Sequence, residues 1–98
     1  MKKLLILLFS LLIIFNSYGA ETISFYANGQ KESVKNYNKD GKLHGNWTHW
    51  FENGQKLSEG HYKDSKADGY WTYWDENGHK VREGHYKDGK LIGETTYY

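Results

Sequence analysis

Residues 50–74 read WFENGQKLSEGHYKDSKADGYWTYW, and most of the 98-residue chain after position 20 consists of copies of this stretch. The dipeptide Asn-Gly returns at intervals of 25 and then 24 residues, at Asn28-Gly29, Asn53-Gly54 and Asn77-Gly78. A repeat of this length is one supersecondary unit that stacks on its neighbours. Residues 21–98 are therefore predicted to form a tandem array of about three units, the last of them truncated.

Other positions follow the same period and align the copies. Glycine recurs every 24 residues at Gly45, Gly69 and Gly93. Tyrosine recurs at Tyr37, Tyr62 and Tyr86, so the first copy carries one extra residue near position 38 or 39. The aligned aromatic positions are Trp47 and Trp71, with Thr95 in third place, and Trp50 and Trp74, with Phe25 before them and Tyr98 after them.

The residues between these markers predict strands. Short runs rich in Trp, Tyr, Phe, Thr and Val alternate with glycine-containing turns, and after position 20 no window has apolar residues at helical spacing. This pattern is typical of β-hairpins. We expect strands at residues 22–26, 31–37, 46–51, 56–62, 70–75, 80–86 and 93–98. The predicted fold class is all-β, with one antiparallel sheet of tandem hairpins.

The Asn-Gly dipeptides are predicted to form the hairpin tips. Both central residues of a type I′ turn need positive φ, which Asn tolerates and Gly adopts freely. A tip of this type at Asn53-Gly54 places Trp50 opposite Leu57 and Trp47 opposite Gly60. The next hairpin likewise pairs Trp74 with Val81 and Trp71 with Gly84. In the connections between hairpins, Asp is expected to cap the turn while Gly takes the positive φ.

Alternation of side chains then divides the residues between two faces of the sheet. One face carries Trp47 and Trp71 over glycines, which we assign to structure. The other carries an apolar strip with a polar rim, the pattern of a binding surface. Its candidate binding residues are Trp50, Trp74, Leu57, Val81, Thr48 and Thr72. The alternative is that these aromatic residues are simply the core of a small sheet.

The N-terminus has the features of a secretory signal peptide. The chain opens with MKK, continues with an apolar run over residues 4–15 broken only by Ser10, and leads into small residues up to Ala20. The run is short for a transmembrane span. We expect residues 1–20 to be cleaved, after Gly19 or Ala20, and the mature domain of residues 21–98 to be exported to the periplasm or beyond.

Composition argues against several functions. Without residues 1–20 the chain keeps 11 basic and 12 acidic residues with mixed signs, so it lacks the basic face that nucleic acids require. It has no Cys, and it shows no catalytic set and no phosphate-binding glycine loop. His61 and His85 occupy equivalent repeat positions, which repetition alone explains. We therefore expect no enzyme activity, no metal and no cofactor.

The recurring pattern ENGQ…SEG.YKD.K..G.WT.W resembles the variant MORN repeat of bacterial proteins. The resemblance covers essentially all of residues 22–98 and departs from the pattern at the extra residue after Tyr37, at Val34-Lys35, at Ser65 and in the truncated last unit. It implies a single-layer twisted sheet of hairpins. Proteins of this kind are scaffolds and interaction modules, sometimes discussed as lipid-contacting, and some carry an antitoxin label. The resemblance implies no shared catalytic residues.

These observations predict an exported, non-enzymatic module that binds another macromolecule, most naturally a protein. A glycan-binding or membrane-contacting module of the envelope is the first alternative, because repeated aromatic residues also stack on sugars. An antitoxin-like partner of a toxin is the second alternative, against which the export signal counts. The unpaired strands at the two ends of the sheet also predict end-to-end self-association.

Overall fold

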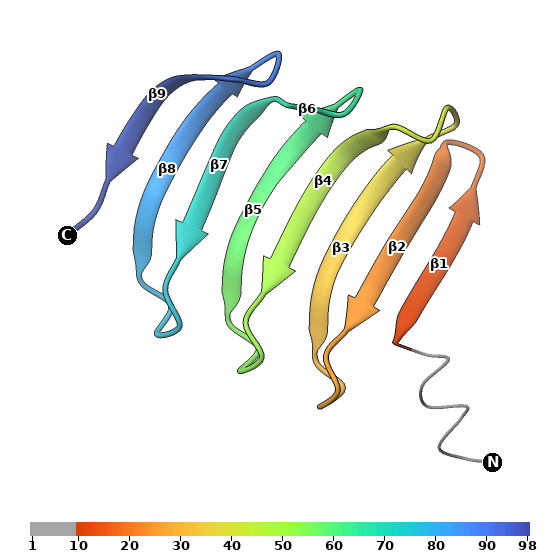
Figure 1. Ribbon diagram of the computed structural model, residues 1–98, viewed down its shortest axis with the longest axis horizontal. Helices are drawn as coiled ribbons and strands as arrows, with labels where there is room; N and C mark the ends of the chain where they lie inside the picture. Colours follow the sequence, from red (N-terminus) through yellow and green to blue (C-terminus); the bar gives the residue numbers. More distant parts are fainter. Residues whose placement is uncertain (1–9) are drawn as a thin grey trace.

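The computed structural model describes residues 10–98, so the charged start and much of the apolar run of the expected signal peptide, residues 1–9, lie outside the described part. Residues 10–98 form one open antiparallel sheet and contain no helix (Figure 1). The molecule measures 50 × 36 × 15 Å, so the sheet is a single layer. The predicted fold class is confirmed. The strands are β1 Leu11–Asn16, β2 Gly19–Phe25, β3 Lys31–Asn38, β4 Leu43–Trp50, β5 Lys56–Lys63, β6 Lys66–Ala67, β7 Gly69–Trp74, β8 Lys80–Lys87 and β9 Lys90–Thr96.

Neighbours in the sequence are neighbours in the sheet. The order is β1-β2-β3-β4-β5-β7-β8-β9, and the two-residue β6 pairs with the end of β5. All seven predicted strands are present, although several begin earlier than expected: β2 at Gly19, β4 at Leu43 and β9 at Lys90. The connections are so short that the pairing continues almost into the turns.

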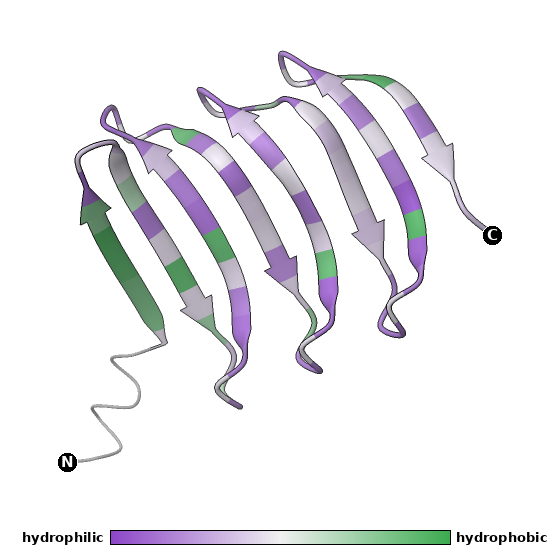
Figure 2. Ribbon diagram, turned by 180° about the vertical axis from the view of Figure 1, so that it is seen from behind, coloured by the Kyte–Doolittle hydropathy of each residue, from purple (hydrophilic) through white to green (hydrophobic). Residues whose placement is uncertain are grey.

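Strand β1 was not predicted from the sequence. It lies at the edge of the sheet and pairs with β2 from Leu11 opposite Ser24 to Asn16 opposite Gly19. Its apolar side chains are exposed, and it is the longest continuous hydrophobic element of the sheet (Figure 2). Pairing uses the backbone, so an apolar segment can extend the sheet without a second layer to bury it. The predicted cleavage after Gly19 or Ala20 would remove β1.

The Asn-Gly tips are not the predicted type I′ turns. The amide of Phe51 donates to the carbonyl of Gln55 (2.8 Å), and the amide of Gly54 donates to the carbonyl of Phe51 (3.0 Å). Gly54 has φ +89°, while Asn53 is absent from the positive-φ residues of the described chain. This is a three-residue loop, a type I turn followed by a glycine bulge. The other two tips, around Gly29 and Gly78, repeat it.

The bulge changes the register beside each tip. Within the hairpins the predicted pairs are confirmed, with Trp47 opposite Gly60 and Trp71 opposite Gly84. Next to the tips the prediction was wrong by one residue: Trp50 lies opposite Lys56 rather than Leu57. Trp74 likewise lies opposite Lys80 rather than Val81. A one-residue shift of this kind brings a different side chain beside each tryptophan.

The tip asparagines connect the hairpins to one another. The Asn28 side-chain amide donates to the carbonyl of Glu52 at 3.0 Å, and that of Asn53 donates to the carbonyl of Glu76 at 2.9 Å. Each side-chain oxygen also accepts the backbone amide two residues further on. These asparagines therefore stack consecutive tips, a function for which their tolerance of positive φ is irrelevant.

Type I′ geometry occurs instead at the opposite ends of the hairpins. Asp64 and Ser65 have φ of 48° and 69°, and Asp88 and Gly89 have φ of 51° and 82°. Asp therefore takes positive φ itself, which corrects the expectation that it caps the turn. The first connection is a three-residue loop closed by Gly41 at φ +79°. That longer loop accounts for the extra residue of the first repeat.

Aromatic rings form the core on one face of the sheet. Trp71 is only 5% exposed, and its ring centroid lies 5.1 Å from that of Tyr62 and 5.4 Å from that of Trp47. Tyr86 extends the cluster, 6.4 Å from Trp71. The side chains meet edge-on or tilted, as aromatic pairs prefer. The face that the sequence assigns to structure is therefore the packed one.

The last strand is displaced by one residue from its predicted alignment. Glu94, rather than Thr95, lies opposite Gly84, and the backbone amide of Tyr97 donates to the carbonyl of Val81. The register shift within β9 leaves one extra residue on that strand. The shift within β4 and the shift between β6 and β7 each leave two. Tyr97, not Tyr98, consequently takes the place that Trp74 holds in β7.

Candidate binding surface

A row of alternating aromatic and lysine side chains crosses the sheet beside the Asn-Gly tips. The face is the one opposite the aromatic core, as alternation along β4 and β7 requires. Each of the strands β2, β3, β4, β5, β7 and β8 contributes one residue, and the last member directly follows β9. We refer to this set as the lysine–aromatic row: Phe25, Lys31, Trp50, Lys56, Trp74, Lys80 and Tyr97.

Each lysine of the row lies over the aromatic ring of the next strand. The Nζ atom of Lys31 is 5.8 Å from the Trp50 ring centroid, and that of Lys56 is 5.6 Å from the Trp74 centroid. Lys80 is 5.5 Å from the ring of Tyr97. These distances fall in the cation–π range, where an exposed contact contributes about 0.5–1 kcal/mol. The same lysine–ring contact therefore recurs once per hairpin along the row.

The bulges at the tips are what place the lysines in the row. With Trp50 opposite Lys56, the Lys56 ammonium reaches Glu59 at 2.9 Å as well as the Trp74 ring. Lys80 makes the corresponding contact with Glu83 at 3.6 Å. Both pairs are partly exposed, so each is worth little to stability. Their effect is to hold extended lysine side chains along the sheet.

A second row of threonine and glutamate lies behind the first. Thr48 is opposite Glu59, Glu59 is opposite Thr72, and Thr72 is opposite Glu83. The Thr72 hydroxyl lies 3.4 Å from a carboxylate oxygen of Glu83, and the Tyr97 hydroxyl donates to the other at 3.3 Å. This is the polar rim that the sequence predicts beside the tryptophans.

The predicted site residues are only partly brought together. Trp50, Trp74, Thr48 and Thr72 occupy the two adjacent rows, as alternation predicts. Leu57 and Val81 do not face the tryptophans, because the bulges leave lysines in those places. The sequence reasoning missed these lysines. The sequence does mark them, because Lys31, Lys56 and Lys80 recur at the same intervals as Asn-Gly.

A hollow of about 390 Å³ opens at the first end of the row, lined by Phe25, Gly29, Gln30, Lys31, Trp50 and Gly54. The Tyr26 hydroxyl donates to the Trp50 carbonyl at 2.6 Å and so ties the first tip to the second hairpin. Desolvation, followed by the carboxylates of Glu32 and Glu52, raises the pKa of Tyr26. The hydroxyl therefore keeps its proton and remains a donor.

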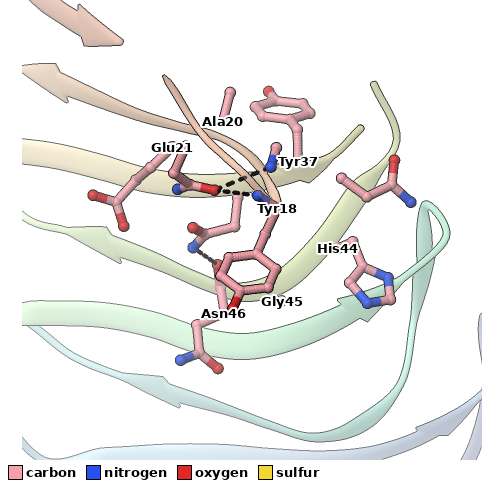
Figure 3. A pocket seen from close by; sticks show the side chains of 11 residues that line it. Tyr18, Ala20, Glu21, Tyr37, His44, Gly45 and Asn46 are labelled. Atoms are coloured by element: carbon pink, nitrogen blue, oxygen red, sulfur yellow. Dashed lines mark hydrogen bonds between the residues drawn. The ribbon is translucent and has the colours of Figure 1, made fainter. Parts of the chain in front are cut away.

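A separate hollow of about 370 Å³ lies at the β1–β2 end (Figure 3). The exposed Tyr18 projects beside it, and the Asn16 side chain accepts the amides of Tyr18 and Gly19 at 2.8 and 3.0 Å. His44, Gly45 and Asn46 also line it (Figure 3). Because Asn16 and Tyr18 belong to the expected signal peptide, this hollow would not survive cleavage, and we do not take it as the site.

Residues 10–98 hold no group of three or more His, Cys, Asp or Glu side chains that could bind a metal ion. Over the same residues, no helix has the length and hydropathy needed to cross a bilayer.

The fold and its surface define a class of protein: a solenoid-like array of β-hairpins that exposes one repeated face. The model of the MORN repeat variant family matches three successive segments, residues 19–39, 43–64 and 67–88. The chain therefore belongs to the MORN repeat variant family, as the sequence pattern indicates. Proteins with these repeats are modules often used in binding.

No curated protein sequence matches the chain. Among solved structures, the chain is similar to one in a crystal structure of accessory secretory proteins 1, 2 and 3 of Streptococcus pneumoniae, with 17% identity and a TM-score of 0.28. That match covers 83% of this chain and 18% of the other.

Proposed function

We propose that this chain is an exported, non-enzymatic module of the bacterial envelope that binds a protein partner through the lysine–aromatic row. The observation that carries the proposal is the repeated placement of Lys31, Lys56 and Lys80 over the rings of Trp50, Trp74 and Tyr97. Export rests on the N-terminal sequence, with its MKK start, apolar run and small residues before Glu21.

The chemistry of the row favours a protein over a sugar or a nucleic acid. Lysines already lie over the rings of Trp50 and Trp74, so a sugar cannot stack freely on those ring faces. An ammonium group has three donors, and Glu59 uses one of those of Lys56. The remaining donors suit carboxylates of a partner, while the indoles supply the apolar contacts that dominate protein interfaces.

The spacing of the lysines suggests the shape of the partner segment. Consecutive lysines are two strands apart, about 10 Å at ordinary strand spacing. Seven residues of an α-helix rise about 10.5 Å, so acidic residues at i, i+7 and i+14 would meet Lys31, Lys56 and Lys80 in turn. An acidic, amphipathic helix lying across the strands is the segment that fits best.

Site-specific photo-crosslinking tests this proposal. A photoreactive amino acid at Thr72, in the rim of the row, should capture one envelope protein, and the same amino acid at His49, on the aromatic face, should not. The charge reversals Lys31→Glu and Lys56→Glu should abolish the capture. Lys42→Glu, in an exposed turn, is the matched control and should leave it unchanged. Equal capture from both faces, or capture that survives the double reversal, would refute the proposal.

A further inference from the structure

We propose that the hollow between Tyr70 and His61 binds one ring of a neutral sugar chain, stacked on Tyr70. The site lies at the start of β7, at the opposite end of the strands from the lysine–aromatic row (Figure 1). The hollow shares Thr48 and Glu59 with the polar rim of that row, whereas Tyr70 belongs to neither row. Substitutions at Tyr70 therefore test the sugar site without changing the surface proposed for the protein partner.

The Tyr70 ring is held flat and open. It stacks on the imidazole of His85, with centroids 4.3 Å apart and planes inclined by 11°, yet 66% of the residue is exposed. His85, on β8, covers one face of the ring. Tyr70 also lines a hollow on its β5 side, so its other face is available to a ligand. The ring is a preorganised platform, which reduces the ordering cost of binding.

Polar groups surround this platform. The hollow measures about 360 Å³, within the size range of small-molecule sites, and its other lining residues are Asn46, Thr48, Glu59, Gly60 and His61. The Asn46 amide and the Thr48 hydroxyl can each donate and accept a hydrogen bond, and the Glu59 carboxylate accepts. Glu59 is ion-paired with Lys56 through one oxygen, which leaves its second oxygen for a ligand.

This combination suits a pyranose ring. A sugar presents an apolar face of C–H groups, which packs on an aromatic ring, and a rim of hydroxyls that both donate and accept. An anionic ligand such as phosphate would meet the Glu59 carboxylate. A purely apolar ligand would leave the carboxylate and the amide without partners, which is costly. The neutral sugar satisfies all of these groups.

Within residues 10–98, the hairpin of β7 and β8 is the one that carries the platform. The residue equivalent to Tyr70 in the preceding hairpin is Asn46, while His61 is equivalent to His85. Tyr70 is not needed to form its strand, because the equivalent strand β4 forms without a tyrosine at this position. On the other side of Tyr70, a smaller hollow of about 180 Å³ is lined partly by Glu83, His85 and Glu94. A chain of sugars passing over Tyr70 would enter it.

The test is titration of the full exported chain with a neutral probe, a β-1,4-linked N-acetylglucosamine tetrasaccharide, followed by NMR amide shifts. We expect saturable shifts centred on Tyr70, His61 and His85. Tyr70→Asn, which installs the residue of the preceding repeat and should preserve the fold, is expected to weaken binding at least tenfold. Tyr70→Phe keeps the platform and should bind within about threefold of the original chain.

Two controls make the result decisive. Trp50→Ala, in the lysine–aromatic row, should leave the sugar titration unchanged, and inorganic phosphate should produce no saturable shift at Tyr70. Absence of saturation by the tetrasaccharide would overturn the proposal. Shifts that persist at full strength in Tyr70→Asn, or that centre on Trp50 and Trp74, would overturn it as well, because the sugar would then bind elsewhere.

Discussion

The indole of Trp71 lies directly over Gly60 on the neighbouring strand, and its N–H donates to the carbonyl of His61 at 3.2 Å. A Cβ atom added at Gly60 would fall within the Trp71 ring. The hairpin register predicted from the sequence places each tryptophan over the glycine of its own hairpin, which for Trp71 is Gly84. In the structure the ring covers the glycine of the preceding hairpin instead, so this contact joins two repeats.

Gly60→Ala is therefore expected to destabilise the protein strongly. Overpacking of a tight core costs about 1–3 kcal/mol, and here the obstacle is a rigid ring with a hydrogen bond of its own. The matched control is Gly93→Ala, where the nearest atom to an added Cβ lies 4.0 Å away. Thermal melts of both variants check the difference. Equal losses would show that the Trp71 ring does not rest on Gly60.

Asn53→Gly distinguishes the observed turn from a type I′ turn. In a type I′ turn glycine would be accepted at this position, because its φ would be positive. Here the substitution removes the hydrogen bond from Asn53 to Glu76 and adds backbone freedom, so we expect a loss of about 1–2 kcal/mol. Asn77→Gly, at the tip without a following hairpin, should cost less. Chemical denaturation of the two variants gives the comparison.

The four tryptophans should divide into two classes on truncation. Trp71→Ala removes a buried ring and is expected to cost about 3–5 kcal/mol, and Trp47→Ala, in the same cluster, should also be severe. Trp50 and Trp74 are partly buried, like Trp47, but their rings contact lysines of the row rather than the Trp47–Trp71–Tyr62 cluster. Trp50→Ala and Trp74→Ala should therefore cost less stability than Trp71→Ala while abolishing partner capture. If all four variants melt alike, the lysine–aromatic row is core rather than a binding surface.

Asp75 should make the third tip sensitive to acid. Backbone hydrogen bonds from His79 and Asn77 lower the pKa of this carboxylate, against a smaller opposing effect of desolvation. A lowered folded-state pKa stabilises the fold above the unfolded-state value of about 3.9, and this contribution is lost as the pH falls through the folded-state pKa. Asp75→Asn should flatten that part of the stability curve. Denaturation between pH 2 and pH 6, about two units either side of that value, measures it, and identical curves would contradict the assignment.

The mature protein is expected to begin at Ala20 or Glu21. The sequence before this point has the charge and hydropathy of a signal peptide, and cleavage there leaves nearly all of β2 in place. Intact mass of the chain recovered from the envelope or medium checks the position. Retention of Met1 on a membrane-bound species would contradict cleavage.

The repeat and its register within the hairpins could be predicted because both depend on local rules. Asn-Gly marks a tip, and alternation then fixes Trp47 opposite Gly60. The turn type could not be predicted in the same way, because Asn-Gly is compatible with both a type I′ turn and a type I turn with a glycine bulge. The side chain of Asn53 bonds a tip 23 residues away, a contact that no local turn rule contains.

The candidate site, too, could be predicted from the sequence only in part. Alternation alone places Trp50 and Thr48 on one face. The neighbour of Trp50 depends on the tip, so an error of one residue in the predicted register put the apolar Leu57 where the structure has the charged Lys56. The platform at Tyr70 had no signal in the repeat, since the stacking of Tyr70 on His85 depends on the twist and register of two particular strands.

The alternation of strand direction decides the polarity of any assembly. With β1 present, the edge strands β1 and β9 run in opposite directions (Figure 1), so identical molecules can join β9 to β1 head to tail with the aromatic face on one side. Without β1 the edges are β2 and β9, which run the same way. Two molecules can then pair antiparallel, with their aromatic faces on the same side, only through two β2 strands or through two β9 strands. Each of these contacts has a two-fold axis. Cleavage of the signal peptide would thus replace an array in which all molecules point the same way with one in which successive molecules alternate in direction.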